Sequence, residues 1–549
     1  MACRNPIIPG FAPDPSIVRI QDTFYLVNSS FHLYPGLPIF ASKDLIDWTH
    51  IGNAIHRPTQ LSLARSCTNL IFSSDDSIEK APVTGGLYAP TIRHHDGTTY
   101  IICTNVVYNE AEDTGDWASG LSFQSFIIST TDIRAGQWSD PIFFDYHGID
   151  PDLFFDDDGR AYISGSSWRP SPSCGISCFE IEIDTGRKLS EETMLWYGHT
   201  QIIPEGPHIY KRGGYYYLLV AEGGTHEGHC ITIARASSIW GPYESCDRNP
   251  ILQSTGMHDP FAYCHYNGHG DLVQDLQGDW WMVCLGVRKD RAGRMILGRE
   301  TFLAAVKWPA GEIWPQIEHP IPRAMYRRLE GGNAEGDSGC STMSSPMEMI
   351  PSPLSPDMDL VWIRDPDFSR SWISTDGRLV CLLASPTDLG ECTGQSMSFI
   401  GRRQRRLAGS ASAALVLSQE SDTEGAVDAK LGLAYYKDEH RYAMIMYEPG
   451  VRTVAFEVLN RAKDPQVWRE KRVEVNCEDA KTITFRIVYT EQLIYFLYRL
   501  GSTADREGWN PCVLVDTLDL SGHDFTGPVI GVFATGLGEE WNRFEEVDI

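Results

Sequence analysis

Acidic side chains recur at one position of a repeated sequence pattern. In the clearest copy, Gly148–Gly165 (GIDPDLFFDDDGRAYISG), Asp150 and a proline lead into an alternating strand, a turn and a second aromatic-rich strand. Four further copies follow the same order. The residues at the equivalent position are Asp14, Ala89, Asp150, Glu205 and His269.

Three carboxylates and an imidazole at one shared position could carry out acid–base chemistry. A single Asp-Pro step is more often a turn or a strand entry, but three acids at equivalent positions favour a function. A buried acid pair with a third carboxylate is typical of glycosidic bond cleavage, in which one group protonates the leaving oxygen and another handles water. Metal binding is the competing interpretation. Calcium and zinc sites usually take several ligands from one short loop, whereas each residue here comes from a different repeat.

The spacing of the copies predicts how these residues meet. The prolines or glycines that follow lie at 15, 90, 151, 207 and 270, so the steps are 75, 61, 56 and 63 residues. Each step leaves room for two strands beyond the hairpin, which is typical of a propeller blade. SKDLIDW (42–48), STTDIRAGQW (129–138) and ASSIWGPY (236–243) recur after their hairpins and are predicted as third strands. The sequence therefore predicts a five-bladed β-propeller whose repeated residues converge on the axis.

The composition of the chain changes once along its length. A segment rich in Gly, Ser and Pro at 330–356 predicts a linker between a propeller, 1–329, and a second unit, 357–549. The second unit has eight or more short strand-like runs without helical periodicity, which favours an all-β sandwich. A sugar-binding or lid-forming module and a structural buttress are both consistent with it. Two insertions, 61–84 and 108–125, are predicted either to wall a pocket or to lie on the surface.

The charge of the chain narrows the classes of partner. Its formal net charge is −27, which argues against nucleic acid or an anionic membrane, because both need clustered Lys and Arg. No apolar run approaches the roughly 20 residues of a membrane span. The 14 cysteines lie mainly in strand-like sequence, where free thiols pack as small hydrophobes. Because no signal sequence is seen, we expect a cytoplasmic protein, or a secreted one if a leader has been removed.

Seven motifs of the chain together resemble a known family. NPIIPGFAPDPSIVR, YAPTIRHHDG, GIDPDLFFDDDGRAY, PEGPHIYK, AEGGT, NGHGDLVQ and LGRETFL are similar to glycoside hydrolase family 43. Within it they are most similar to the β-xylosidase and α-L-arabinofuranosidase branch with a carboxy-terminal, concanavalin-like β-sandwich. The resemblance covers nearly the whole chain and implies an inverting, single-displacement hydrolysis that requires no cofactor.

The resemblance also implies a role for each matching residue. Asp14 is similar to the general base, Glu205 to the general acid, and Asp150 to the carboxylate that raises the pKa of the acid and orients it. Phe31 resembles a hydrophobic wall, Arg299 an arginine that grips sugar hydroxyls, and Phe525 a residue that reaches over the pocket from the sandwich. The implied substrate-binding set is Phe31, Tyr88, Ala89, Thr225, His269, Arg299 and Phe525.

Two details of the resemblance leave alternatives open. His269 is similar to a residue that orders an axial water or a structural calcium ion, and a hydrogen-bonded core histidine is the alternative. Tyr88 stands where relatives usually have Trp, and Asp152 where they usually have Ser. Either departure is expected to shift substrate preference without removing a catalytic group.

These observations predict an exo-acting glycosidase that releases terminal β-1,4-linked D-xylose from short xylo-oligosaccharides. An α-L-arabinofuranosidase, alone or as a second activity, is the nearest alternative. A non-catalytic sugar-binding propeller is an alternative from a different class, and a retaining fructosidase-type propeller is disfavoured by its different nucleophile context. The expected partner is a small oligosaccharide, and homo-oligomerisation is left open.

Overall fold

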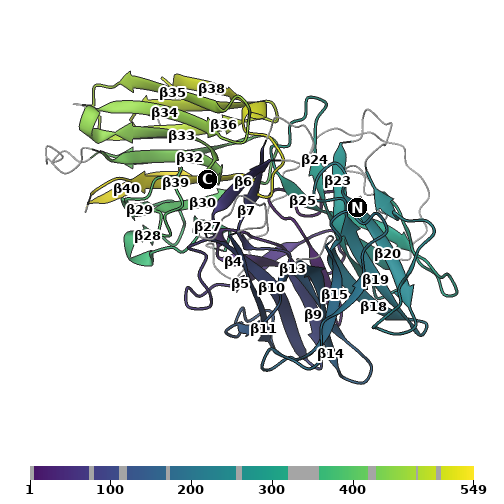
Figure 1. The fold of residues 1–549 in the computed structure, drawn as a ribbon. Coiled ribbons are helices and arrows are strands. Elements are labelled where there is room, and N and C mark those ends of the chain that lie inside the picture. The colour runs from purple at the N-terminus through teal and green to yellow at the C-terminus, as the bar shows by residue number, and fades with distance from the viewer. Residues whose placement is uncertain are drawn as a thin grey trace, which may run out of the picture.

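The protein is built almost entirely from β-strands, in two parts (Figure 1). A computed structural model describes residues 5–72, 80–109, 120–168, 174–254, 263–319, 358–417, 428–477, 480–501, 508–538 and 540–549. The predicted linker, 330–356, lies outside these residues. No helix in this described part is long and apolar enough to cross a membrane.

Five antiparallel sheets form the first part, which confirms the predicted five-bladed propeller. Blade one contains β1 (Ser16–Ile20), β2 (Thr23–Val27), β4 (Gly36–Ser42) and β5 (Thr49–Ile55). Blade two contains β8 (Gly86–Leu87), β9 (Thr91–His95), β10 (Thr98–Tyr108), β11 (Leu121–Thr130) and β12 (Ile142–Phe144). Blade three contains β13 (Gly148–Phe155), β14 (Ala161–Ser167), β15 (Gly175–Glu182), β16 (Arg187–Lys188) and β17 (Thr193–Trp196).

The last two blades complete the ring. Blade four contains β18 (Glu205–Arg212), β19 (Tyr215–Glu222), β20 (Cys230–Ala236), β21 (Glu244–Ser245) and β22 (Leu252–Gln253). Blade five contains β23 (Cys264–Gln274), β24 (Trp280–Arg288), β25 (Arg299–Lys307) and β26 (Gln316–Ile317). The innermost strands β1, β9, β13, β18 and β23 contact one another in ring order, and β1 contacts β23.

The amino-terminal residues help to close this ring. Ile8 forms a bridge with Thr301 of β25, and the Asn5 side chain donates to the Leu303 carbonyl over 2.8 Å. Residues from the start of the propeller therefore add to the third strand of its last blade.

The segments predicted as third strands are turns instead. β4, β11 and β20 are the third strands, and SKDLIDW (42–48) begins where β4 ends. The Asp44 carboxylate accepts the backbone N–H groups of Ile46 and Asp47, which fixes a tight turn. The prediction was wrong because the repeated tryptophan marks the buried end of this turn, where Trp48 donates to the Leu45 carbonyl.

Two large sheets pack face to face in the second part, which confirms the predicted sandwich. One sheet contains β3 (Leu33–Tyr34), β27 (Leu360–Ile363), β30 (Phe399–Arg403), β39 (Val529–Thr535), β32 (Lys430–Asp438), β33 (Arg441–Glu448), β34 (Thr453–Asn460) and β35 (Val467–Glu474). The other contains β28 (Ser371–Ile373), β29 (Val380–Leu383), β40 (Trp541–Asp548), β31 (Gly409–Val416), β36 (Thr482–Tyr489), β37 (Leu493–Leu500) and β38 (Asn510–Asp516). Three 3-10 helices, η2 (Phe368–Arg370), η3 (Pro449–Val451) and η4 (Thr517–Asp519), lie in its connections.

The propeller contributes one strand to the sandwich. β3 follows Phe31 in blade one, yet it pairs with β27, with Leu33 opposite Ile363 and Tyr34 opposite Trp362. The backbone of Phe31 is therefore attached, two residues later, to a sheet of the second part.

The first insertion forms a second connection between the two parts. β6 (Thr68–Phe72) and β7 (Lys80–Thr84) form a hairpin, which lies beside the sandwich (Figure 1). The Thr68 N–H donates to Glu439 over 2.6 Å, and the Lys80 N–H donates to the Ala462 carbonyl over 2.9 Å. Of the second insertion, residues 110–119 lie outside the described part.

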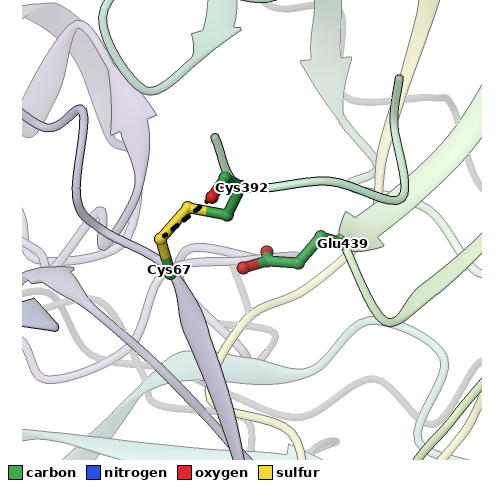
Figure 2. Close-up of side chains that lie close together, drawn as sticks. All are labelled: Cys67, Cys392 and Glu439. Carbon is green, nitrogen blue, oxygen red and sulfur yellow. Dashed lines mark hydrogen bonds between the residues drawn. A yellow bond between two sulfur atoms is a disulfide. The ribbon is translucent and has the colours of Figure 1, made fainter. Parts of the chain in front are cut away.

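A disulfide joins the same two regions. Cys67, directly before β6, is bonded to Cys392 of the sandwich, 325 residues away, and Glu439 lies beside the pair (Figure 2). The expectation that these two cysteines are free thiols was wrong, because their partners come from different domains and sequence spacing does not reveal that. The other ten cysteines in the described part are free and mostly buried.

Removing this disulfide is expected to weaken the attachment between the two parts. We expect the Cys67→Ser/Cys392→Ser variant to unfold at a midpoint several degrees lower, because such a crosslink typically contributes about 2–4 kcal/mol. Calorimetry in the presence and absence of a reductant checks this. The reductant should lower the midpoint of the native chain and leave that of the variant unchanged, and an equal response of both would contradict the assignment.

Candidate active site

Irregular backbone directs the acids toward the propeller axis. Asp14 and Asp150 have left-handed backbone, with φ of 50° and 55°, directly before a proline. Such a conformation costs about 1–3 kcal/mol and persists only where the surroundings enforce it. A bulge between Ile149 and Asp152 in β13 accompanies it. The backbone is therefore strained at Asp14 and Asp150 themselves.

In blade four a glycine adopts the left-handed backbone that Asp14 and Asp150 adopt in their blades. The left-handed residue before its proline is Gly206, with φ of 54°, so Glu205 lies one residue earlier than the other two acids in the repeat. A Cβ atom at Gly206 would lie 2.8 Å from the ring of His269. Glycine is thus required here by both the backbone angle and the close approach.

Asp14 is held by groups from blades one and five. The Ser29 hydroxyl donates to its Oδ2 over 2.6 Å, and Arg299 Nη1 donates to its Oδ1 over 3.1 Å. The same Nη1 donates to the Thr225 hydroxyl over 2.9 Å. Asp14 is nearly fully buried, so this ion pair compensates for the loss of solvent around its charge.

Asp150 contacts both the backbone that follows Glu205 and the ring of His269. Its Oδ2 accepts the Gly206 backbone N–H over 3.0 Å, and His269 Nδ1 lies 3.9 Å from the same oxygen. Burial, and then the charges of Glu205 and Asp14, raise the pKa of Asp150 well above its ordinary value. Burial lowers the pKa of His269 to about 4, so its imidazole is neutral at pH 7.

Glu205 has the environment of a proton donor. Burial and then the negative charge of Asp14 raise its pKa from 4.5 to about 7, against the opposing effect of Arg299. Its Oε1 lies 4.0 Å from Nε2 of His229, whose own pKa burial lowers to about 3. Near neutral pH the cluster therefore contains an acid that is still partly protonated.

Aromatic rings form a wall beside these groups. The ring centroids of Phe31 and Tyr88 are 5.0 Å apart, and that of Phe525 is 6.0 Å from Phe31. The Arg299 guanidinium lies 5.3 Å from the Phe31 centroid and 5.1 Å from that of Phe525. Its Nη2 also donates to the Phe525 carbonyl over 3.0 Å. Apolar ring faces beside polar groups suit the two faces of a sugar ring.

The predicted site residues therefore lie together. Ala89 differs from the others in the kind of contact that it makes. It is buried beside Tyr88 and has no polar side chain with which to bind a sugar. Sequence reasoning missed Ser29 and His229, although Ser29 lies in the SSF motif and His229 lies four residues after Thr225. Ser29 bonds to Asp14, 15 residues earlier in blade one, and His229 lies against Glu205 within blade four, so only the folding of each blade brings these pairs together.

Asp152 lies in a buried polar network, and its expected effect on substrate preference stays a prediction. Arg93 Nη2 donates to its Oδ1 over 2.8 Å, His208 Nδ1 lies 3.1 Å from that atom, and the Ile209 N–H donates to Oδ2 over 2.9 Å. Asp152 follows the bulge in β13 and is paired with the Arg93 guanidinium within this network. It is thus a structural residue whose charge is already balanced.

Comparison with known proteins identifies the family. The model of glycosyl hydrolases family 43 matches residues 3–314, and that of the beta xylosidase C-terminal concanavalin A-like domain matches residues 355–548. The chain belongs to glycosyl hydrolase family 43. This family 43 protein is therefore a glycoside hydrolase, as its motifs predict.

Relatives of the family 43 chain have two kinds of activity in their names. A non-reducing end alpha-L-arabinofuranosidase of Bacteroides ovatus is 33% identical over 98% of this chain and 92% of that protein. A xylosidase/arabinosidase of Butyrivibrio fibrisolvens is 40% identical over 58% of this chain and 57% of that protein. The crystal structure of a xylan beta-1,4-xylosidase of Bacillus halodurans aligns with a TM-score of 0.79 at 27% identity, covering 99% and 98% of the two chains.

The raised pKa of Glu205 predicts how this family 43 protein responds to pH. Between about pH 4.5 and 7 the native state keeps a proton that the unfolded state has lost, so stability falls as pH rises through this window. We expect Glu205→Gln to stabilise the protein by on the order of 1–3 kcal/mol at pH 8–9, with little effect at pH 4. Chemical denaturation at both pH values checks this. Equal effects at both would contradict the raised pKa.

Proposed function

We propose that the protein is an exo-acting, inverting β-xylosidase that removes terminal β-1,4-linked D-xylose from xylo-oligosaccharides. The observation that carries the proposal is the acid cluster. Asp14 is paired with Arg299, Asp150 is bound to the Gly206 N–H, and Glu205 has a pKa of about 7. Relatives named beta-xylosidase, among them one from Bacillus subtilis at 32% identity over 58% of this chain, support the choice of sugar.

In the proposed reaction, Asp14 and Glu205 act on opposite sides of the scissile bond. The Asp14 carboxylate accepts a proton from a water molecule, whose oxygen bonds to the anomeric carbon as the bond to the leaving oxygen breaks. Glu205 donates its proton to that leaving oxygen, so the products are free xylose and a shortened sugar. Such a single displacement inverts the anomeric configuration. Exchange of one proton with solvent then restores both carboxyl groups.

Asp150 and Arg299 are proposed to set the geometry and charge of this reaction. Asp150 binds the backbone N–H directly after Glu205, so it orients the general acid. Arg299 neutralises Asp14 and has further donors that could bind sugar hydroxyls. The aromatic wall supports an exo mode of action, because Phe525 comes from the sandwich and places its ring 6.0 Å from that of Phe31 in the propeller.

The proposed chemistry requires no cofactor. The sequence also left open a structural calcium ion near His269. Calcium prefers six to eight oxygen ligands. The described contacts of the His269 ring include the Asp150 carboxylate at 3.9 Å, Gly206 and the imidazole of His208. This donor set is a poor fit to calcium, and no step of the reaction is assigned to a metal.

An α-L-arabinofuranosidase is the second candidate. It is favoured by the Bacteroides ovatus relative, which matches 98% of this chain. Paired assays on aryl β-D-xyloside and aryl α-L-arabinofuranoside, with proton NMR of the first-formed sugar, separate the candidates. We expect the xyloside to give the higher kcat/KM and the inverted anomer to form first. A dominant arabinofuranosidase rate would reverse the order of the two candidates, and retention would contradict the mechanism.

The two proposed roles predict different responses to the leaving group. We expect Glu205→Gln to lower kcat about 10²–10⁴-fold on a xyloside with a poor leaving group, which needs protonation, and much less on one with a dinitrophenyl group. Asp14→Asn should lower both rates to a similar degree, because water activation does not depend on the leaving group. Steady-state kinetics on both substrates check this, and identical profiles for the two variants would rule out the assignment.

A further inference from the structure

A buried group of charges lies directly behind the loop that carries Phe525. Lys437 and Asp438 end β32, Arg441 begins β33, and Asp524 lies in the loop before β39. All four residues are at most 5% exposed. The set, which we call the charge cluster, contains two basic and two acidic side chains, so its formal charges balance, and burial together with Arg441 lowers the pKa of Lys437 well below its ordinary value.

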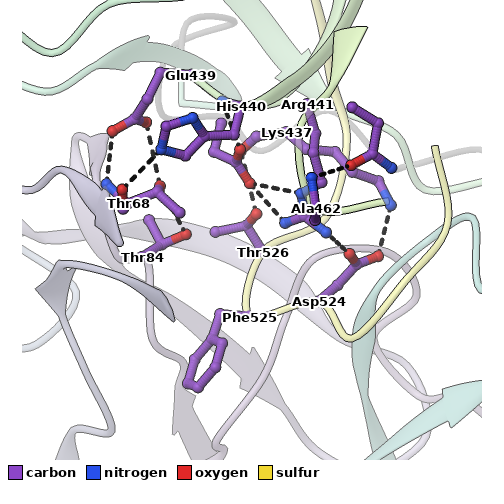
Figure 3. Close-up of polar contacts among 12 residues, drawn as sticks. Thr68, Thr84, Lys437, Glu439, His440, Arg441, Ala462, Asp524, Phe525 and Thr526 are labelled. Carbon is purple, nitrogen blue, oxygen red and sulfur yellow. Dashed lines mark hydrogen bonds and ion pairs between the residues drawn. The ribbon is translucent and has the colours of Figure 1, made fainter. Parts of the chain in front are cut away.

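Asp524 is held from two sides within the charge cluster. Lys437 Nζ donates to its Oδ2 over 2.6 Å, and Arg441 Nη1 contacts its Oδ1. Arg441 also donates to Asp438 over 2.6 Å and 2.9 Å. Figure 3 shows the Asp524 carboxylate pointing to these cations while the Phe525 ring points away from them.

The residue after Phe525 is anchored to the same turn. The Thr526 hydroxyl donates to the Lys437 carbonyl over 3.1 Å. A Cβ atom at Gly527 would lie 2.5 Å from the Leu297 carbonyl oxygen, so the loop backbone lies directly against blade five. Phe525 is thus the one residue between two anchored neighbours, and its carbonyl accepts from Arg299.

We propose that Asp524 is a positioning residue, which the charge cluster holds so that Phe525 closes the sugar pocket. This inference rests on the proposed function. Asp524 contacts none of the acids, so it would act through the Phe525 ring and through the carbonyl that orients Arg299. A buried charge whose partner is removed must rearrange or become solvated. Loss of the Asp524 carboxylate therefore releases the loop that carries Phe525.

The test uses a charge-balanced change together with a matched control. Lys437→Met/Asp524→Asn removes one charge of each sign, so Arg441 and Asp438 remain paired. The control is Lys430→Met/Asp388→Asn, which removes a partly exposed ion pair of 2.5 Å at the start of β32, about 23 Å from Lys437 along the same strand. The single variant Asp524→Asn provides a second measure of the same anchor.

We expect the charge-balanced variant to lose at least about tenfold in kcat/KM on the aryl pentoside, whereas the control changes it less than twofold. In a Phe525→Ala background the same change should have a clearly smaller further effect, because the part of the loss that acts through the ring is already gone and only the part that acts through the residue-525 carbonyl remains. Additive losses, or losses equal to those of the control, would overturn the proposal.

The pH dependence of kcat/KM provides a further test, because general destabilisation of the fold would not change it. Glu205 faces Asp14, Asp150, Arg299 and His229, and burial is the main cause of its raised pKa. When Phe525 no longer closes the pocket, water reaches Glu205, so the basic limb of kcat/KM should move from near pH 7 to lower pH. An unmoved limb in a variant that has lost activity would contradict the proposal.

Failure of the proposed function gives a different pattern. A native chain that hydrolyses neither aryl pentoside contradicts the activity and not the positioning. Crystal structures of the charge-balanced and control variants then decide the inference. Displacement of Phe525 in the first alone supports it, and an unmoved Phe525 overturns it.

Discussion

Arg299 is the group on which both the charge and the shape of the site depend. It begins β25 in blade five, yet it pairs with Asp14 of blade one and donates to Thr225 of blade four. It also donates to the Phe525 carbonyl of the sandwich. One guanidinium therefore balances a buried carboxylate and connects both parts of the molecule. Arginine suits this task because its planar fork presents several donors at once and its charge is permanent.

The three acids differ in chemistry because their surroundings differ. Asp14 has a hydroxyl and a guanidinium as partners, whereas Glu205 has a neutral imidazole 4.0 Å away and little solvent. Asp14 thus accepts two hydrogen bonds, whereas the surroundings of Glu205 raise its pKa and favour its protonated form. A division between base and acid thus follows from burial and pairing.

The repeat was sufficient to predict the propeller, because each copy of the pattern shows alternation and a turn that belong to one blade. It also predicted the shared position of Asp14 and Asp150, since an acid before a proline recurs there. The one-residue offset of Glu205 was missed, because its left-handed angle falls on Gly206. The third strands were misplaced, because the turn that Asp44 fixes recurs after other hairpins, and this recurrence was taken as the sign of a strand. The disulfide and the pairing of β3 with β27 join residues hundreds of positions apart, and the charge cluster joins Lys437 to Asp524 over 87 positions, so no local pattern indicates them.

The bridge between Ile8 and Thr301 has a consequence for biosynthesis. Blades one to four can form their hairpins as they leave the ribosome, since most of their pairings are between neighbours in sequence. Blade five cannot be completed until β25 has emerged, nearly 300 residues after the segment that it must find. The nascent chain therefore carries its first residues unpaired through most of the translation of the propeller. Assembly of the Asp14–Arg299 pair is one of the last events of that process, so partly synthesised chains contain no complete site.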